Sequence, residues 1–261
     1  MGREVIPEVD REWSKIEYKR RPTMPKQKDR PPSPIVMEPN EDILNELLKR
    51  SNEIINDAIT RQKSKGTGHA TRITTDKIVM DPRVRWKCRI PICFGYGMTL
   101  NCPPHSPTTE EMTEIVNSYK EAILITFNPP PKNAVFPDYP IASPDDINLL
   151  NQMVCRIEAD ATYLGYYLAM GFKGGPCCGC GFLSPEYLKD SFKRNKLPPC
   201  PSLNGEMCPQ YLKARPALEA CGVDVFATAI KCGEKPAYVI NPEHSKKSVP
   251  YAVWHGIVLV I

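Results

Sequence analysis

AILITF, residues 122–127, is a short run in which only Thr126 is polar. Apolar runs of this length are typical of a strand that is buried on both faces of a sheet. Further strands are predicted in three other stretches: 71–80, 223–230 and 251–261. Residues 66–69 interrupt the pattern before the first of these. We therefore expect a small mixed β-sheet.

Helices are predicted where apolar residues recur every three or four positions. The first begins at Asn40, a residue type that caps helix N-termini, and runs to about Gln62. A second begins after Ser106 or Thr108 and carries carboxylates in its first turn. A third spans about 145–170, with an expected core face of Ile147, Leu150, Val154, Ile157, Ala161, Leu164 and Leu168. Shorter helices are expected at two further places: residues 185–194 and the stretch that ends at Gly222.

These elements predict an α+β fold, in which helices cover the sheet and cysteine-rich loops project from it. The expected organisation has three parts: a tail over 1–39, a helical segment over 40–66 and a main domain over 70–261. The tail contains seven prolines and few apolar residues, so it is expected to be extended. Its apolar exceptions, Trp13, Ile16 and Tyr18, are candidate anchors for a protein partner.

Composition excludes several functional classes. The formal net charge of +4 is small and spread along the chain, which gives no case for binding nucleic acid. No apolar run is long enough to enter a membrane as a spanning helix, and the first residues lack the apolar region of a secretion signal. We therefore expect a cytoplasmic protein. No motif for a dinucleotide, a phosphate loop or a nucleophile elbow is present.

The 11 cysteines carry the functional information, and none of them precedes Cys88. A chain of this size without a secretion signal is expected to keep its thiols reduced, so disulfides are the weaker interpretation. Grouped, reduced cysteines in a cytoplasmic protein point to metal binding.

One cysteine group lies in GGPCCGCGFLSPEYLKDSFKRNKLPPCPSLNGEMCP, residues 174–209. Its predicted ligands are Cys177, Cys180, Cys200 and Cys208. The first two have the CxxC spacing that lets two thiolates reach one metal or cluster, and the last two each precede a proline that favours extended backbone. Nearby glycines would let backbone N–H groups approach the sulfides of a cluster. Four thiolates fit a [4Fe–4S] cluster or zinc, and the wide spacing favours the cluster.

The other group lies in KCRIPICFGYGMTLNCPPHSP, residues 87–107, and comprises Cys88, Cys93 and Cys102. Three thiolates are one fewer than a closed site needs. The fourth ligand is therefore either a side chain from elsewhere in the chain, a solvent molecule or a substrate. The candidate side chains are His105, Cys155, Cys178, Cys221 and Cys232. Of these, Cys155 and Cys221 fit better as small apolar residues of the core.

Both groups resemble the "predicted metal-binding protein" family, also called domain of unknown function 2284. The resemblance rests on the first cysteine stretch followed by YKEAILI, and on GGPCCGC, CPSLNGEMCP and ARPALEACGVDVFATA farther along, and it covers about 70–261. It implies metal ligands at Cys88, Cys93, Cys102, Cys177, Cys180, Cys200 and Cys208. The chain departs from the family pattern by an insertion over about 182–198. The family occurs largely in anaerobes, which suits oxygen-sensitive clusters.

These observations predict an iron–sulfur protein with two [4Fe–4S] clusters that passes electrons to or from a larger redox or one-carbon enzyme complex, docked through residues 1–39. One alternative is an enzyme with an open iron at the three-cysteine group. Another is a structural subunit held together by zinc. The lack of any organic-cofactor motif favours an accessory electron-transfer subunit over a self-contained enzyme, and whether the chain is an enzyme stays open.

Overall fold

The structure is a computed structural model, and it describes residues 34–91, 93, 95–133, 144–177, 200–239 and 249–261. Several predictions fall outside the described residues: residues 1–33 of the tail, the helix at 185–194, the insertion over about 182–198, and Cys178 and Cys180.

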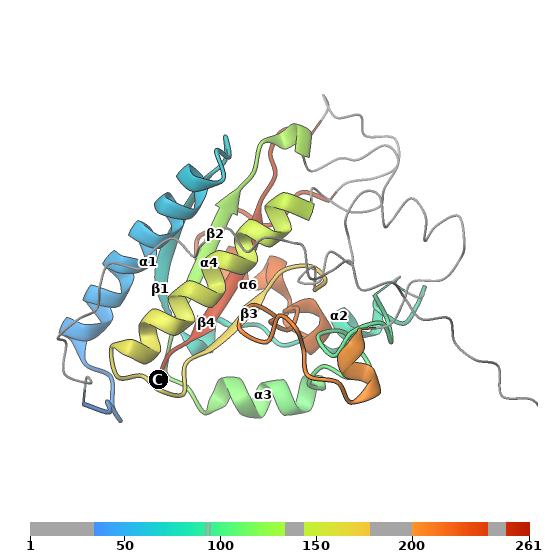
Figure 1. Cartoon of the computed structure of the whole chain (residues 1–261), viewed down its shortest axis with the longest axis horizontal. Helices are drawn as coiled ribbons and strands as arrows, with labels where there is room; N and C mark the ends of the chain where they lie inside the picture. The colour runs from blue at the N-terminus through green and yellow to red at the C-terminus, as the bar shows by residue number, and fades with distance from the viewer. Residues whose placement is uncertain (1–33, 92, 94, 134–143, 178–199, 240–248) are drawn as a thin grey trace, which may run out of the picture. The chain divides into compact units, whose positions relative to one another are not determined.

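Four antiparallel strands form one sheet in the order β1-β2-β4-β3 (Figure 1). Their bounds are β1 (Thr67–Thr74), β2 (Glu121–Asn128), β3 (Met170–Lys173) and β4 (Trp254–Leu259). The predicted α+β class is confirmed, and every strand pairing is antiparallel where a mixed sheet was expected. The AILITF run is an interior strand whose six residues are all buried, as predicted.

Helices cover both faces of this sheet. Their bounds are α1 (Glu41–Arg61), α2 (Pro82–Trp86), α3 (Thr109–Asn117), α4 (Pro144–Tyr163) and α6 (Val225–Lys231). Short 3-10 turns lie at η2 (Thr75–Lys77), η3 (Pro131–Asn133), η4 (Pro201–Asn204) and η5 (Glu219–Cys221).

Alternation along β2 divides the core into two layers. Ile123, Ile125 and Phe127 face the cluster that includes α1 and α4, which lie side by side in Figure 1. Ala122 and Leu124 face the opposite cluster, to which α3 and α6 contribute. Cys221 of η5 and Phe172 of β3 lie in this second cluster, and α2, which precedes the first cysteine loop, contacts η5.

The first helix begins where the sequence predicts, because the Asn40 side chain accepts a hydrogen bond from the Ile43 N–H at 3.1 Å. Arg72 of β1 then ties this helix to the sheet. Its guanidinium contacts the Glu41 carboxylate at 2.6 Å and the Glu121 carboxylate at 2.8 Å. Such paired contacts fix the angle between helix and sheet more than they add stability.

Two glycines let α4 lie directly on the sheet. A Cβ on Gly256 would stand 2.5 Å from a Val154 methyl, and one on Gly171 would stand 2.7 Å from the other. Any larger residue at either position would push the helix away from β3 and β4. The close approach buries Leu150 and Val154 completely.

The third helix is shorter than predicted, because the chain leaves helical geometry after Tyr163 and turns through Gly165 at φ +108°. Leu168, expected on the core face, is 60% exposed. The turn leads into β3, which begins at Met170, where the predicted helix was expected to end; no strand was predicted there.

The strand predicted at 223–230 is wrong, since this segment forms α6. The Asp224 carboxylate caps the Ala227 N–H at 2.9 Å, and Val225, Thr228 and Ala229 are buried with helical spacing. A further correction concerns β1, which begins at Thr67, within the stretch expected to interrupt the pattern. Gly68 suits this strand because a Cβ there would meet an Ile55 methyl of α1 at 2.9 Å.

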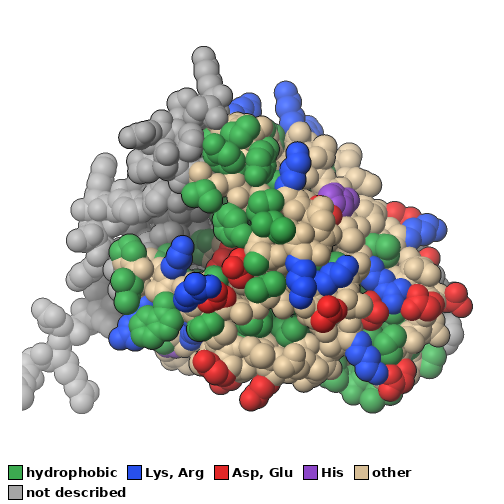
Figure 2. Space-filling model, turned by 180° about the vertical axis from the view of Figure 1, so that it is seen from behind, with side chains coloured by type: hydrophobic (Ala, Val, Ile, Leu, Met, Phe, Trp, Pro, Cys, Tyr) green, Lys and Arg blue, Asp and Glu red, His purple; other side chains and the backbone are tan. Residues whose placement is uncertain are grey.

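Charged side chains of both signs are interspersed on the face shown in Figure 2. This agrees with the small net charge and gives that face no extended field of one sign. Among the described helices, none has the length and apolar character needed to cross a bilayer.

His255 is a buried titratable group in the sheet, 2% exposed. Its Nε2 donates to the Lys235 carbonyl at 2.9 Å, which leaves Nδ1 to accept from the Thr126 hydroxyl at 3.3 Å. Burial lowers the pKa of His255, so the ring stays neutral in the folded chain.

We expect this ring to make the fold less stable in acid. The unfolded chain takes up a proton as the pH falls through about 6.5, while the folded chain resists it, so the stabilisation is present above that pH and is lost below it. His255→Gln keeps a donor but cannot titrate. Urea unfolding at about pH 7.5 and about pH 5.5 should give a larger drop in midpoint for the wild type than for the variant. Equal drops would contradict the assignment.

Candidate metal centre

The three cysteines of the first group lie on one folded loop that follows α2. Asp81 caps α2 through the Arg83 N–H at 2.8 Å, and the chain then turns repeatedly. The Cys93 N–H donates to the Cys88 carbonyl at 2.9 Å, and the Gly97 N–H donates to the Pro103 carbonyl at 2.7 Å. These hydrogen bonds close the loop on itself.

The thiols of Cys93 and Cys102 converge around Gly95. A Cβ built on Gly95 would stand 3.4 Å from the Cys102 sulfur and 4.0 Å from the Cys93 sulfur. The glycine therefore leaves the space beside both sulfurs open. At this point the structure brings two predicted ligands together.

Cys88 lies near the same two thiols. Burial raises the pKa of Cys88 to about 11, and the neighbouring Cys93 and Cys102 add to the effect. Burial also raises the pKa of Cys102, which is 6% exposed, and the nearby Cys177 raises it further. Without metal these two thiols are protonated at neutral pH, so binding a metal ion there must release protons.

Cys177, from the second group, reaches this neighbourhood by way of β3. Lys173, the last residue of β3, donates its backbone N–H to the Pro216 carbonyl at 3.1 Å and accepts from the Leu218 N–H at 2.8 Å. Ala217 between them donates to the Asn101 carbonyl at 3.3 Å, beside Cys102. Three segments far apart in the sequence are thus held side by side.

Cys200 also joins the first loop. Its N–H donates to the Met98 carbonyl at 3.0 Å, between Cys93 and Cys102 in the sequence. Cys200 and Cys208 are both half-buried, and η4 separates them. Since Cys180 is not among the described residues, a common site for Cys177, Cys180, Cys200 and Cys208 stays a prediction. Within the described chain, no three His, Cys, Asp or Glu side chains are arranged to hold a single metal ion.

The remaining described cysteines belong to the core or its edge. The Cys155 thiol of α4 is buried and lies 3.3 Å from the Lys213 carbonyl. Cys221 is fully buried in the second core cluster, and Cys232 packs against that cluster. Burial raises the pKa of Cys221 to about 12, and Glu219, Cys102 and Cys88 add to the effect. Cys221 therefore lies near Cys88 and Cys102.

Three charged residues near the cysteines were missed by the sequence analysis. The Arg85 guanidinium donates to the Ala220 carbonyl at 3.0 Å and to the Ser106 carbonyl at 3.2 Å, which joins the first loop to η5. The Glu219 carboxylate accepts from the Gly175 N–H at 3.3 Å, and the Lys173 ammonium is buried beneath residues 174–176. No sequence pattern marks Arg85 or Glu219, because each acts through backbone groups distant in the chain.

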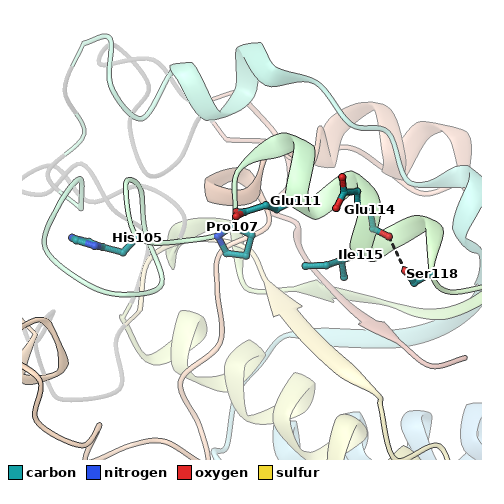
Figure 3. Close-up of a pocket in the computed structure, with 6 residues that line it drawn as sticks. All are labelled: His105, Pro107, Glu111, Glu114, Ile115 and Ser118. Atoms are coloured by element: carbon teal, nitrogen blue, oxygen red, sulfur yellow. Dashed lines mark hydrogen bonds between the residues drawn. The ribbon is translucent and has the colours of Figure 1, made fainter.

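A shallow groove runs along α3. Its lining is His105, Pro107, Glu111, Glu114, Ile115 and Ser118 (Figure 3). The Glu111 side chain accepts from the Thr108 N–H at 2.8 Å in a capping box, so it serves the helix terminus. In Figure 3 the His105 ring extends from the loop away from both carboxylates.

Comparison with known proteins gives one match. The family described as "Predicted metal-binding protein (DUF2284)" matches residues 71–260. No curated protein and no solved structure matches the sequence.

The space beside Gly95 gives a graded test of the first group. Gly95→Ala adds a Cβ at ordinary contact distance from the Cys102 sulfur, whereas Gly95→Val adds methyl groups between that sulfur and Cys93. We expect the Ala variant to bind Co(II) nearly as the wild type does and the Val variant to lose about tenfold or more in affinity. Thiolate-to-cobalt absorption during anaerobic titration measures this, and equal binding by the Val variant would remove these sulfurs from the site.

Proposed function

The chain belongs to the DUF2284 family of predicted metal-binding proteins, and from this premise we propose that it is an iron–sulfur protein that transfers electrons. The proposed ligands are Cys177, Cys180, Cys200 and Cys208 for one [4Fe–4S] cluster and Cys88, Cys93 and Cys102 for a second. The observation that carries the proposal is the backbone hydrogen bond between Cys200 and Met98, which joins the two cysteine groups. Two adjoining clusters form an electron path, which two isolated structural sites would not.

The donor set supports a soft metal. Thiolates select zinc, copper(I) and iron–sulfur clusters over magnesium or calcium, which prefer oxygen. The open space at Gly95 further suits a cluster, because backbone without a Cβ can approach inorganic sulfide closely.

The protein's own residues would bury the metal and set its surroundings. Cys102 is almost fully buried, which keeps water from its sulfur, and Arg85 holds the loop against η5. Backbone N–H groups and a buried cation near the thiols would favour negative charge there. A bound [4Fe–4S] cluster would supply the one-electron centre, and a protein partner would supply or accept the electron.

A protein partner completes the proposal. We propose a larger redox or one-carbon enzyme complex in an anaerobe, with residues 1–39 as the docking segment. The apolar residues Trp13, Ile16 and Tyr18 among prolines and charges support this role.

Anaerobic purification tests the function. We expect a brown protein with about eight iron atoms and a matching amount of acid-labile sulfide per chain, and a paramagnetic signal after dithionite reduction. Colourless protein that contains stoichiometric zinc would overturn the proposal in favour of a structural zinc protein. A cluster with one iron that binds added ligands would instead support an open site at Cys88, Cys93 and Cys102.

Single substitutions test the grouping of the ligands. Cys200→Ser should remove about half of the iron and one of two paramagnetic signals, because it removes a ligand from only one cluster. Cys155→Ser is the matched control, since that thiol of α4 contacts the Lys213 carbonyl and is not a proposed ligand. Full iron content in the Cys200 variant would contradict the assignment.

A further inference from the structure

Lys173 is the one lysine among the described residues that is completely buried. A buried ammonium group is costly unless hydrogen bonds or opposite charges replace its hydration. Within the described part of the chain, no carboxylate forms an ion pair with it. Other contacts must therefore compensate for the burial of the Lys173 ammonium.

Backbone carbonyls replace the water around this ammonium. Its Nζ donates to the Gly175 carbonyl at 2.9 Å, to the Gly174 carbonyl at 3.5 Å and to the Pro176 carbonyl. An ammonium has three donors, so three consecutive carbonyls use all of them. Residues 174–176 therefore form a turn that wraps around the Lys173 side chain.

Other contacts hold the same turn in place. The Gly174 N–H donates to the His255 carbonyl at 2.8 Å, and the Gly175 N–H donates to the Glu219 carboxylate at 3.3 Å. Gly175 adopts φ +76°, and a Cβ there would stand 3.1 Å from the Trp254 ring. Cys177 follows directly after this turn in the sequence.

The positive charge of Lys173 lies among thiols. It lowers the pKa of Cys102 and of Cys155 against the larger effect of burial. Lys173 acts in the same direction on the pKa of the Glu219 carboxylate, which burial raises and which accepts from the Gly175 N–H of the same turn. The ammonium therefore has a carboxylate as well as thiols in its surroundings.

We infer that Lys173 is a positioning residue of the metal centre, which wraps residues 174–176 so that Cys177 is held beside the Cys88, Cys93 and Cys102 loop. This inference rests on the proposed function only for its metal part. The wrapping of the turn is independent of what binds there.

A double-mutant cycle on the full chain tests the metal part, with Co(II) as the probe. Lys173→Met keeps the length of the side chain and removes the ammonium, and Cys177→Ser removes the thiol. We expect each single variant to bind Co(II) about tenfold more weakly than the wild type. Because Lys173 acts through Cys177, the double variant should bind no more than about twofold more weakly than Cys177→Ser alone.

Lys231→Met is the matched control. The Lys231 ammonium also donates to a backbone carbonyl, that of Asp76, but it lies on the exposed surface of α6. Its removal should leave Co(II) affinity unchanged.

Hydrogen exchange of the metal-free chain tests the wrapping of the turn. Lys173→Met should make the amides of Gly174, Gly175 and Cys177 exchange faster, while those of β2 keep their protection. Gly175→Ala perturbs the same turn by a second route, through its positive φ and the Trp254 ring, and should have the same local effect. This variant keeps the test available should Lys173→Met fail to fold.

Two results would overturn the inference. One is unchanged exchange at Gly174, Gly175 and Cys177 in folded Lys173→Met. The other is a loss of Co(II) affinity from Lys173→Met that is equal in the wild-type background and in the Cys177→Ser background. A wild-type chain that binds neither Co(II) nor iron would overturn the proposed function and the metal part of the inference together. Faster exchange at Gly174, Gly175 and Cys177 would in that case still support the positioning part.

Discussion

Backbone hydrogen bonds on both edges of β3 hold the cysteine-bearing segments of this protein together. On one edge, β3 pairs with β4 through the register Lys173 to Gly256. On the other edge, Lys173 exchanges hydrogen bonds with Pro216 and Leu218, and Ala217 in turn contacts Asn101. Without this short strand, the loops that carry Cys102 and Cys177 would have no common support.

The packing of α4 makes that strand possible. Gly171 and Gly256 remove two side chains from the face that α4 covers, and Val154 fills the space. The strand is therefore held by backbone pairing at its edges and by a helix on one face. A rigid sheet is a better platform for ligands than a free loop, because ligand geometry must be reproducible to a fraction of an ångström.

The charges around the thiols follow from the same arrangement. Burial raises the pKa values of Cys88 and Cys102, which keeps these thiols neutral until a metal displaces their protons. Lys173 is a buried positive group that lowers the pKa of Cys102 and also that of the Glu219 carboxylate. The fold thus provides a protected place for soft ligands with charged groups of both signs close to it.

Local patterns in the sequence determined the α+β class, the buried strand over 122–127, the cap at Asn40 and the two cysteine groups, because apolar period, capping chemistry and ligand spacing act over a few residues. The tertiary structure decided the rest. It paired β3 with β4 on one edge and with residues 216–218 on the other, and it brought the Cys200 N–H to the Met98 carbonyl. Those outcomes depend on contacts between residues tens of positions apart, for which a single sequence contains no local signal.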